Sequence, residues 1–392
     1  MPSSSIITRN VWILSLVSLF TDVASEMLYP VMPVYLKSIG FSIVFIGVLE
    51  GFAEAVAGLS KGYFGNLSDS LGRRLPFVQI GYALSAVSKP MMAVFVYPLW
   101  IFFARTTDRL GKGVRTGARD ALLSDEATPE TKGRVFGFHR AMDTTGAVIG
   151  PLLALVYLQR HPGAYQMLFL IAFLPGVLAI AFTALMREKG KAREAVVPKP
   201  GFLDFLRYWR RSPAQYRQLA GALLVFTLFN SSDVFLLLKI KDAGLSDGAV
   251  IGVYIFYNLV YALSSYPFGV LADRLGMKRV FVSGLFLFAL VYAGMAFATT
   301  LPVFLSLFFL YGLYAAATEG VAKAWITNIC EQKDTATAIG TFTAFQSVGS
   351  LGASSLAGFM WYSTGAGTTF ALSAAMTAMV AMYLVRSFMD PL

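Results

Sequence analysis

The sequence predicts an all-α polytopic membrane protein with twelve transmembrane helices in two pseudo-symmetric bundles of six. Of its 392 residues, 56% are hydrophobic and 14% charged, with a mean hydropathy of +0.64. A soluble domain does not need so apolar a composition. The stretch GNLSDSLGRR at 65–74 returns as GVLADRLGMK at 269–278, an offset of 269 − 65 = 204 residues. Because this offset is about half the chain, two halves built on one plan are predicted.

The apolar runs give the individual spans. A helix needs about 20 apolar residues to cross a hydrocarbon core of roughly 30 Å. Turn signals and charges then divide the chain into spans at 11–36, 42–61, 76–96, 99–121, 135–158, 166–186, 218–240, 247–268, 280–298, 302–325, 339–361 and 368–386. We therefore expect a first bundle over 1–186, a linker over 187–217 and a second bundle over 218–392. The amphipathic middle of the linker predicts a short helix on the membrane surface.

The distribution of basic residues predicts the orientation in the membrane. Lys and Arg outnumber Asp and Glu by 32 to 22. They gather in the loops on one side and in the linker, whereas the loops on the other side hold only Lys37, Arg160, Lys239 and Lys241. By the positive-inside rule, both termini are expected in the cytoplasm of a multi-pass protein of the cytoplasmic (inner) membrane. The surplus of basic residues is therefore explained by the orientation in the membrane. No nucleic-acid partner is expected.

The repeated stretch combines glycines, an acid and basic residues between two apolar spans. Its members are Gly65, Asp69, Gly72, Arg73 and Arg74 in the first copy and Gly269, Asp273, Gly276 and Lys278 in the second. This pattern resembles the signature loop of the major facilitator superfamily, between the second and third helices, with its weaker copy between the eighth and ninth. The resemblance covers essentially the whole chain and implies alternating access around a central cavity. We expect the ion pairs Asp69–Arg73 and Asp273–Lys278 to stabilise one conformation.

The fifth span carries a second motif, made of Gly137, Gly146, Gly150 and Pro151. It resembles the glycine–proline motif of the antiporter branch of the superfamily, although the family's later glycines are replaced here by Ala154 and Leu155. Small residues at such a spacing let helices pack closely. The resemblance implies a proton-coupled antiporter.

Ionisable residues within the spans are the candidates for proton coupling, because charges in the membrane are costly and usually functional. The first two spans carry Asp22 and Glu26, and Glu50 and Glu54, each pair four residues apart and so on one helix face. We expect Arg109 to pair with Glu26, Glu50 or Glu54. The segment 109–113 resembles the arginine–glycine motif of proton-coupled members. Moving the arginine would change the proton affinity of its partner. A purely structural ion-pair network is the competing interpretation.

The candidate substrate-cavity residues combine polar groups with aromatic rings, which suit an amphipathic organic solute. They are Arg105, Lys112, His139, Asp143, Asn230, Tyr254, Tyr257, Asn258, Tyr261, Tyr311, Tyr314 and Gln346. For the tyrosines of the eighth span, plain helix packing is the alternative. Asp233 is interpreted as lying at a kink of the seventh span.

These observations favour a secondary active transporter that exports a small amphipathic solute in exchange for protons. An alternative is an importer or exchanger of an organic anion, such as a carboxylate, phosphate ester or chelate, held by Arg105, Arg109, Lys112 and Arg115. A weaker alternative is a metal-ion exporter that uses the four acids with His139. No nucleophile–base pair, phosphate loop or metal motif indicates an enzyme, and no cofactor or resident metal is expected. The partners expected of this monomer are a small-molecule substrate, protons and the lipid bilayer.

Overall fold

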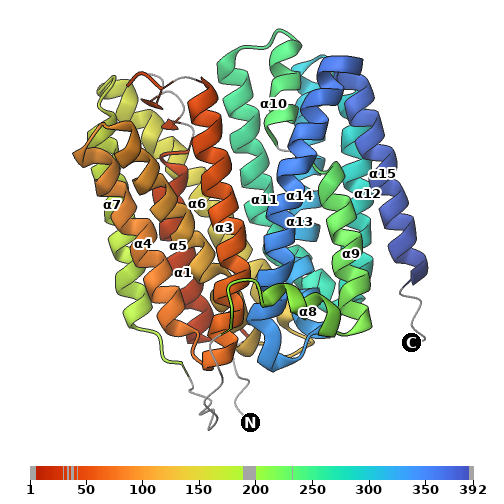
Figure 1. Ribbon diagram of the computed structural model, residues 1–392. Helices are drawn as coiled ribbons and strands as arrows, with labels where there is room; N and C mark the ends of the chain where they lie inside the picture. Colours follow the sequence, from red (N-terminus) through yellow and green to blue (C-terminus); the bar gives the residue numbers. More distant parts are fainter. Residues whose placement is uncertain are drawn as a thin grey trace. The chain divides into compact units, whose positions relative to one another are not determined.

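The structure is a computed structural model of the 392-residue chain (Figure 1). It describes residues 6–29, 31–32, 35–36, 39–41, 43–188, 200–231 and 233–387, without the side chains of 43–48, 50, 51, 247 and 248. Every regular element in this part of the chain is a helix, which confirms the predicted fold class. Residues 189–199 of the predicted linker lie outside the described residues.

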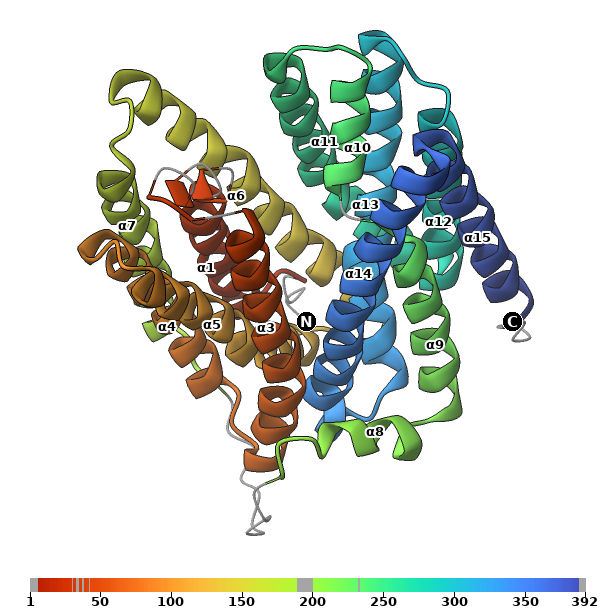
Figure 2. The same ribbon diagram turned by 45° about the horizontal axis from the view of Figure 1, so that its top comes forward.

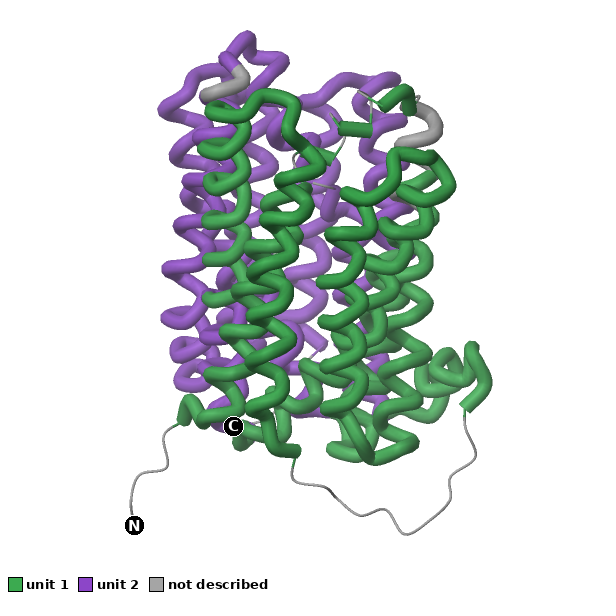
Figure 3. The backbone as a smooth tube through the Cα atoms, turned by 90° about the vertical axis from the view of Figure 1, so that its left-hand side faces the viewer, with its two compact units in different colours: residues 1–128, 142–212, 330–347 green, residues 129–141, 213–329, 348–392 purple. Residues whose placement is uncertain are grey.

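The chain forms two compact units, which Figure 3 shows in different colours. Unit 1 comprises residues 1–128, 142–212 and 330–347, and unit 2 comprises 129–141, 213–329 and 348–392. Each unit therefore takes a short segment from the other half of the sequence. The predicted division of the sequence into a bundle over 1–186, a linker over 187–217 and a bundle over 218–392 stays a prediction.

Unit 1 is a helical bundle in which α4 and α7 pack on each other, as do α4 and α5, α3 and α5, and α1 and α7 (Figures 1 and 2). Its core includes Tyr35, whose ring packs edge-on against Phe169 at a centroid distance of 4.9 Å. The helices of this unit are α1 (Arg9–Glu26), α3 (Ile43–Leu71), α4 (Leu75–Val94), α5 (Pro98–Asp125), α7 (Tyr165–Ala184) and α8 (Phe205–Arg211). They are joined by the later part of α6 (Lys132–Arg160) and the first part of α14 (Thr335–Thr364).

Unit 2 repeats the same internal packing. Its helices are α9 (Ala214–Phe229), α10 (Asp233–Asp242), α11 (Asp247–Leu275), α12 (Met277–Met295), α13 (Leu301–Ile329) and α15 (Ala366–Ser387). Here α12 packs on α13 and α15, α11 on α13, and α9 on α15. At an offset of 204 residues, α3, α4, α5 and α7 correspond to α11, α12, α13 and α15. The packing therefore repeats in the way that the sequence duplication predicts.

Several predicted boundaries are wrong, and the reasons are local. The first helix ends at Glu26, well before the predicted residue 36. The seventh predicted span is broken into α9 and α10. The repeated ten-residue stretch is mostly helical, because α3 continues to Leu71 and α11 to Leu275. The chain turns only at Gly72 and Gly276, with φ of 64° and 92°. These positive φ values favour glycine at both turns. The linker helix predicted on amphipathicity is present as α8.

Seven helical segments of the described residues are long and apolar enough to cross a membrane. They are Lys132–Arg160, Tyr165–Ala184, Ala214–Asp242, Ala249–Leu275, Met277–Met295, Leu301–Ile329 and Ala366–Ser387. The long helices α1, α3, α4, α5 and α14 are missing from this set. Of these, α1, α3 and α5 each carry several charged residues, which makes them the places to look for a polar site.

Candidate functional site

The first polar cluster of unit 1 lies where α3 packs on α5. The Arg109 Nε lies 3.3 Å from Glu54 Oε1, and the Glu54 side chain is 48% exposed. Of the acids expected to pair with Arg109, Glu54 thus does so. The side chain of Glu50 lies outside the described residues. Because the Glu54 carboxylate is half-exposed, it is accessible to protons, and the ion pair with Arg109 can break.

A second group of acids lies between α1 and α6. The carboxyl group of Asp143 acts on that of Asp22, and Ser18 Oγ donates to Asp143 Oδ1 at 2.5 Å. The two helices approach closely at the glycines of the fifth predicted span. A Cβ on Gly146 would lie 2.5 Å from the Leu19 carbonyl oxygen. Two neighbouring carboxyl groups repel each other when both are charged, so this group is a candidate site for a proton.

Glu26 completes this acidic group, and the charges of Lys112, Arg109 and Arg105 on α5 act on it. Most of the α5 cations also have specific partners. Lys89 of α4 lies 2.7 Å from Asp108, which also receives Arg105 at 3.6 Å. Further pairings are Arg115 Nη1 with Ser85 Oγ at 2.6 Å and Arg119 with Asp120 at 2.8 Å. The charged stripe predicted on this helix is therefore largely neutralised within unit 1.

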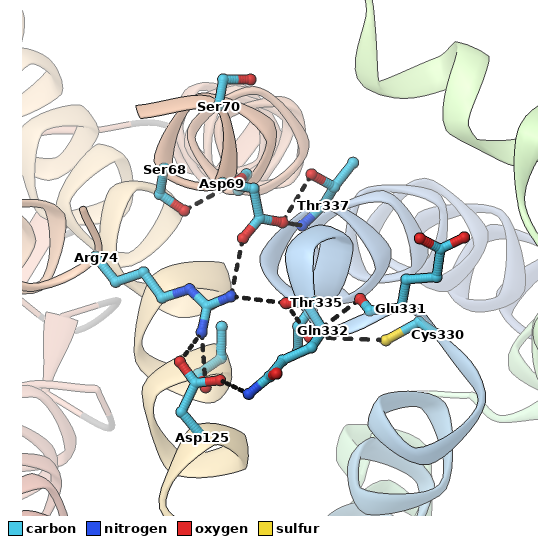
Figure 4. Close-up of polar contacts among 12 residues, drawn as sticks. Ser68, Asp69, Ser70, Arg74, Asp125, Cys330, Glu331, Gln332, Thr335 and Thr337 are labelled. Atoms are coloured by element: carbon cyan, nitrogen blue, oxygen red, sulfur yellow. Dashed lines mark hydrogen bonds and ion pairs between the residues drawn. The ribbon is translucent and has the colours of Figure 1, made fainter. Parts of the chain in front are cut away.

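The acid of the first repeat, Asp69, lies near the end of α3 (Figure 4). Its Oδ2 accepts hydrogen bonds from the Thr337 backbone N at 2.7 Å and from the Thr337 Oγ1 at 2.9 Å. Its Oδ1 pairs with Arg74 at 3.1 Å, and Arg74 also binds Asp125 and the Gln332 carbonyl oxygen. Asp69 thus satisfies the start of α14, where free N–H groups and the helix dipole favour an anion. We call Asp69, Arg74, Asp125 and Thr337 the Asp69 cluster.

The second repeat makes the equivalent contact in unit 2. Asp273 on α11 accepts from the backbone N of Gly133 at 2.7 Å and of Arg134 at 2.9 Å, at the start of α6. The Arg134 Nε adds a bond of 2.8 Å. The offset holds for both partners, since 69 + 204 = 273 and 133 + 204 = 337. We call Asp273, Gly133 and Arg134 the Asp273 cluster.

Close helix packing supports both clusters. A Cβ on Gly65 would lie 2.4 Å from the Ala336 carbonyl oxygen, and one on Gly269 only 2.2 Å from that of Gly133. A Cβ on Gly137 would lie 2.6 Å from the Ser265 carbonyl oxygen. The repeated glycines therefore allow the backbone contact that brings each acid to a helix start.

The expected partners of the two acids are wrong. Arg73 is exposed and makes no ion pair with the described residues, while Arg74 takes its place. Lys278 donates instead to the Val385 carbonyl oxygen at 3.0 Å, and Asp273 pairs with Arg134. The reason is that α3 and α11 continue almost to the turning glycine, so each acid faces the start of a neighbouring helix. After the first turn, Arg74 and not Arg73 reaches Asp69.

A cavity of about 630 Å³ lies beside the Asp69 cluster within unit 1. Its lining includes Asp69, Arg74, Asp125 and Glu188. The Glu188 carboxylate accepts from the backbone N of Arg74 at 2.7 Å and of Leu75 at 3.0 Å. It therefore caps the start of α4 and fixes the backbone that carries Arg74. Sequence reasoning missed Glu188, since nothing in the order of residues brings the end of α7 to the start of α4.

Burial raises the pKa of Asp69 from 3.8 to about 6, although Arg74 and Thr337 favour its charged form. The folded state binds this proton more tightly than an exposed carboxyl does. The resulting stabilisation is therefore fully present below about pH 3.8 and is lost as the pH rises through about 6.

We predict that Asp69→Asn removes this pH dependence. Over this range the wild-type protein should lose on the order of 3 kcal/mol more stability than the variant as the pH rises. Thermal unfolding in detergent at pH 4.5, 5.5 and 7 measures the difference. Asp242→Asn, at an exposed helix end, should keep the wild-type slope. Equal slopes for Asp69→Asn and wild type would contradict the assignment.

The tyrosines of the second half gather in unit 2. The rings of Tyr257 and Tyr311 lie with centroids 5.0 Å apart, and those of Tyr311 and Tyr314 are 5.2 Å apart. Tyr261 lies under the guanidinium of Arg140, 5.3 Å from the ring centre. The Tyr254 ring lies next to this group, with its centroid 6.2 Å from that of the Tyr257 ring. The predicted aromatic group is thus one cluster on α11 and α13.

The other predicted cavity residues lie elsewhere or are otherwise engaged. The Asn258 amide donates to the Tyr254 carbonyl oxygen of its own helix at 3.0 Å. His139 is buried in the unit 2 part of α6, and Gln346 belongs to the unit 1 part of α14. Lys112 is exposed and forms no ion pair with the described residues. Pro151 lies inside α6, one residue after Gly150, whose Cβ would lie 2.7 Å from the Met27 N.

The described residues contain seven segments that are long and apolar enough to cross a membrane and two equivalent helix-end clusters, which define a polytopic membrane protein built on a repeat. The sequence model described as "Major Facilitator Superfamily" matches residues 14–257 and again 242–391. The chain belongs to this superfamily, and the predicted resemblance is confirmed.

Individual relatives agree with this assignment. The chain is 31% identical over 361 residues to the MFS-type transporter MJ1317 of Methanocaldococcus jannaschii, covering 91% of this chain and 89% of the relative. It is 23% identical over 316 residues to the multi-drug resistance efflux pump PmrA of Streptococcus pneumoniae, covering 76% and 75%. The crystal structure of the human organic anion transporter MFSD10 superposes with a TM-score of 0.80 at 16% identity, covering 96% of this chain and 99% of that one. The chain is therefore a multi-pass secondary transporter.

Proposed function

We propose that this transporter exports a small amphipathic organic solute in exchange for protons. It does so by alternating access, as a monomer in the cytoplasmic (inner) membrane with both termini in the cytoplasm. The observation that carries the proposal is the ion pair of Arg109 with Glu54, at 3.3 Å, in a helix whose other cations are mostly paired. Proton uptake by Glu54 would release Arg109.

The acids of α1 and α6 extend this proton site. The carboxyl groups of Asp22 and Asp143 act on each other, and the charges of the α5 cations act on Glu26. A proton could therefore be held on α1 or on α3, with the α5 cations between them. Such a group can change its protonation as the transporter changes conformation.

The Asp69 and Asp273 clusters supply the conformational part of the proposal. Each joins a carboxylate to the start of a helix from the other half of the sequence, Thr337 on α14 or Gly133 on α6. Both contacts must open for the helix starts to move. The two clusters would then stabilise one end state of the cycle.

The direction of transport is supported by two observations. The glycines of α6 pack directly on α1, as Gly146 does at the Leu19 carbonyl oxygen, which is the role expected of the antiporter motif. The relative PmrA is described as an efflux pump. Export is therefore the favoured direction.

The test is solute movement driven by an imposed pH gradient. Purified protein in liposomes with an acidic interior should take up an amphipathic solute while protons leave, as reported by an internal pH dye. A suitable panel contains tetraphenylphosphonium, chloramphenicol and taurocholate, which differ in charge. Protein-dependent loss of the gradient with any of them supports the proposal. If none of the three moves in response to the gradient, the proposal of proton-coupled export fails.

The organic-anion alternative is favoured by one observation, the exposed Lys112 without an ion pair among the described residues. Arg109→Gln separates the two functions. Proton-coupled export predicts that solute binding survives while the response to the pH gradient is lost. An anion site predicts that binding itself is lost even with protons equilibrated. For the metal-ion alternative, no group of three metal-ligating side chains occurs among the described residues.

A further inference from the structure

Unit 2 contains a break in the seventh predicted span. The helix α9 ends at Phe229 and α10 begins at Asp233. Asn230 has φ −91° and ψ 86°, which is not helical. Within a membrane, a broken helix needs a partner for its freed polar groups, either protein or a bound ligand. The C-terminal end of α9 also carries the negative end of its helix dipole.

Asp233 at this break has no basic partner. Its Oδ1 accepts a hydrogen bond of 2.7 Å from the Tyr311 hydroxyl, the single hydrogen bond it makes with the described residues. The charge of Glu319 acts on it, and the neutral tyrosines Tyr257 and Tyr314 lie in its neighbourhood. In the described part of the chain, no Lys, Arg or His lies within ion-pair distance of its carboxylate.

The nearest basic side chain of the tyrosine cluster is already engaged. Arg140 pairs with Glu319 at 3.4 Å and hydrogen-bonds to the Tyr261 hydroxyl. Its guanidinium also lies 5.3 Å from the centre of the Tyr261 ring. Glu319 therefore has a protein cation as its partner, and Asp233 does not.

The groups around Asp233 are all suited to a positive ligand. The Asn230 Oδ1 is a buried acceptor without a hydrogen-bond partner in the described residues, while its Nδ2 lies 3.3 Å from the Tyr314 hydroxyl. The Tyr257, Tyr311 and Tyr314 rings form one stack, with neighbouring centroids 5.0 and 5.2 Å apart. Aromatic faces attract cations, and an unpaired carboxylate and carbonyl do the same.

We propose that Asp233, Asn230 and the tyrosines Tyr257, Tyr311 and Tyr314 bind an organic cation, an ammonium or phosphonium with apolar substituents. The inference rests on the proposed function, because it names the substrate class of that transporter. The Tyr311 hydroxyl orients the carboxylate, and the rings cover the apolar groups of the ligand. A purely structural role for Asp233, as an acid in the first turn of α10, would not select ligands by charge.

The test compares two ions of nearly the same shape and opposite charge, tetraphenylphosphonium and tetraphenylborate. Binding of each to the full chain in lipid nanodiscs is measured by equilibrium dialysis without a pH gradient. Wild type should bind the phosphonium and not the borate. Asp233→Asn should weaken phosphonium binding about tenfold or more, as removal of a desolvated charge partner does. The matched control is Asp242→Asn, the same change at the exposed end of the same helix, which should bind like wild type.

A second variant keeps the test valid if Asp233→Asn does not fold. Tyr257→Leu removes one aromatic face and keeps the carboxylate, so it should weaken phosphonium binding at least about threefold. The proposal is overturned if Asp233→Asn binds the phosphonium with wild-type affinity. If that variant does not fold, wild-type affinity in Tyr257→Leu overturns it. Equal binding of the two ions by wild type would also overturn it.

The outcome separates this site from the proposed function. If wild type binds no phosphonium but exchanges chloramphenicol or taurocholate for protons, the cation site is wrong and proton-coupled export stands. If phosphonium binds in an Asp233-dependent way but no solute responds to the pH gradient, the site stands and proton coupling fails.

Discussion

Lys89→Met should destabilise the protein by about 3–5 kcal/mol, the range typical of a buried ion pair that loses one partner. Lys89 and Asp108 lie 2.7 Å apart, with side chains only 2% and 7% exposed. The substitution leaves the Asp108 carboxylate buried, with Arg105 at 3.6 Å as its remaining cation. Denaturant titration in mixed micelles measures the free energy of unfolding.

Two further variants test the cause of this effect. In Lys89→Met/Asp108→Asn both charges are absent, so much of the lost stability should return. Lys333→Met breaks an ion pair with Glu331 of 2.6 Å whose side chains are 59% and 62% exposed, and should cost about 0–1 kcal/mol. A cost for Lys89→Met no larger than for Lys333→Met would show that the buried pair does not stabilise the fold. The same conclusion follows if the double variant loses as much free energy of unfolding as Lys89→Met and Asp108→Asn lose when their separate losses are added.

Glu54→Gln should reduce the response of transport to a pH gradient at least about tenfold. Solute exchange at equal pH should stay largely intact. The amide keeps the size of the side chain but cannot take up a proton. Arg109 would then lose its charged partner and remain in one position. Solute uptake into liposomes, with and without a gradient, measures both activities. Glu331→Gln makes the same chemical change at an exposed ion pair and should transport like wild type. Gradient-driven uptake by Glu54→Gln at the wild-type rate would contradict the prediction.

The fold could be predicted from the sequence because its signals are repeated and long-ranged. Apolar runs marked the helices, and the 204-residue offset predicted the equivalence of Asp69 and Asp273 that the two clusters display. The spacing of Gly146 and Gly150 predicted close helix packing, which the approach to α1 confirms. These features depend on periodicity and residue size, which a single sequence contains.

The partners of the acids could not be predicted in the same way. Asp69 bonds Thr337, 268 residues further along the chain, and the turn at Gly72 brings Arg74 and not Arg73 to it. The partner of Lys89, Asp108, lies on another helix, so no spacing along α4 indicates the pair. The sequence predicts a kink at Asp233, and the absence of a basic partner among the described residues becomes visible only when its neighbours are known. Such contacts are set by the packing of helices, which charge patterns along one helix do not contain.

The central claim is that carboxylates opposite the α5 arginines exchange protons for solute. Simultaneous measurement of proton and solute fluxes in the same proteoliposomes tests it most directly. In wild type, protons should move against the solute in a fixed ratio, and in Glu54→Gln the solute should exchange with no proton movement. A solute flux in wild type without a proton flux, or an unchanged proton flux in Glu54→Gln, would contradict the claim.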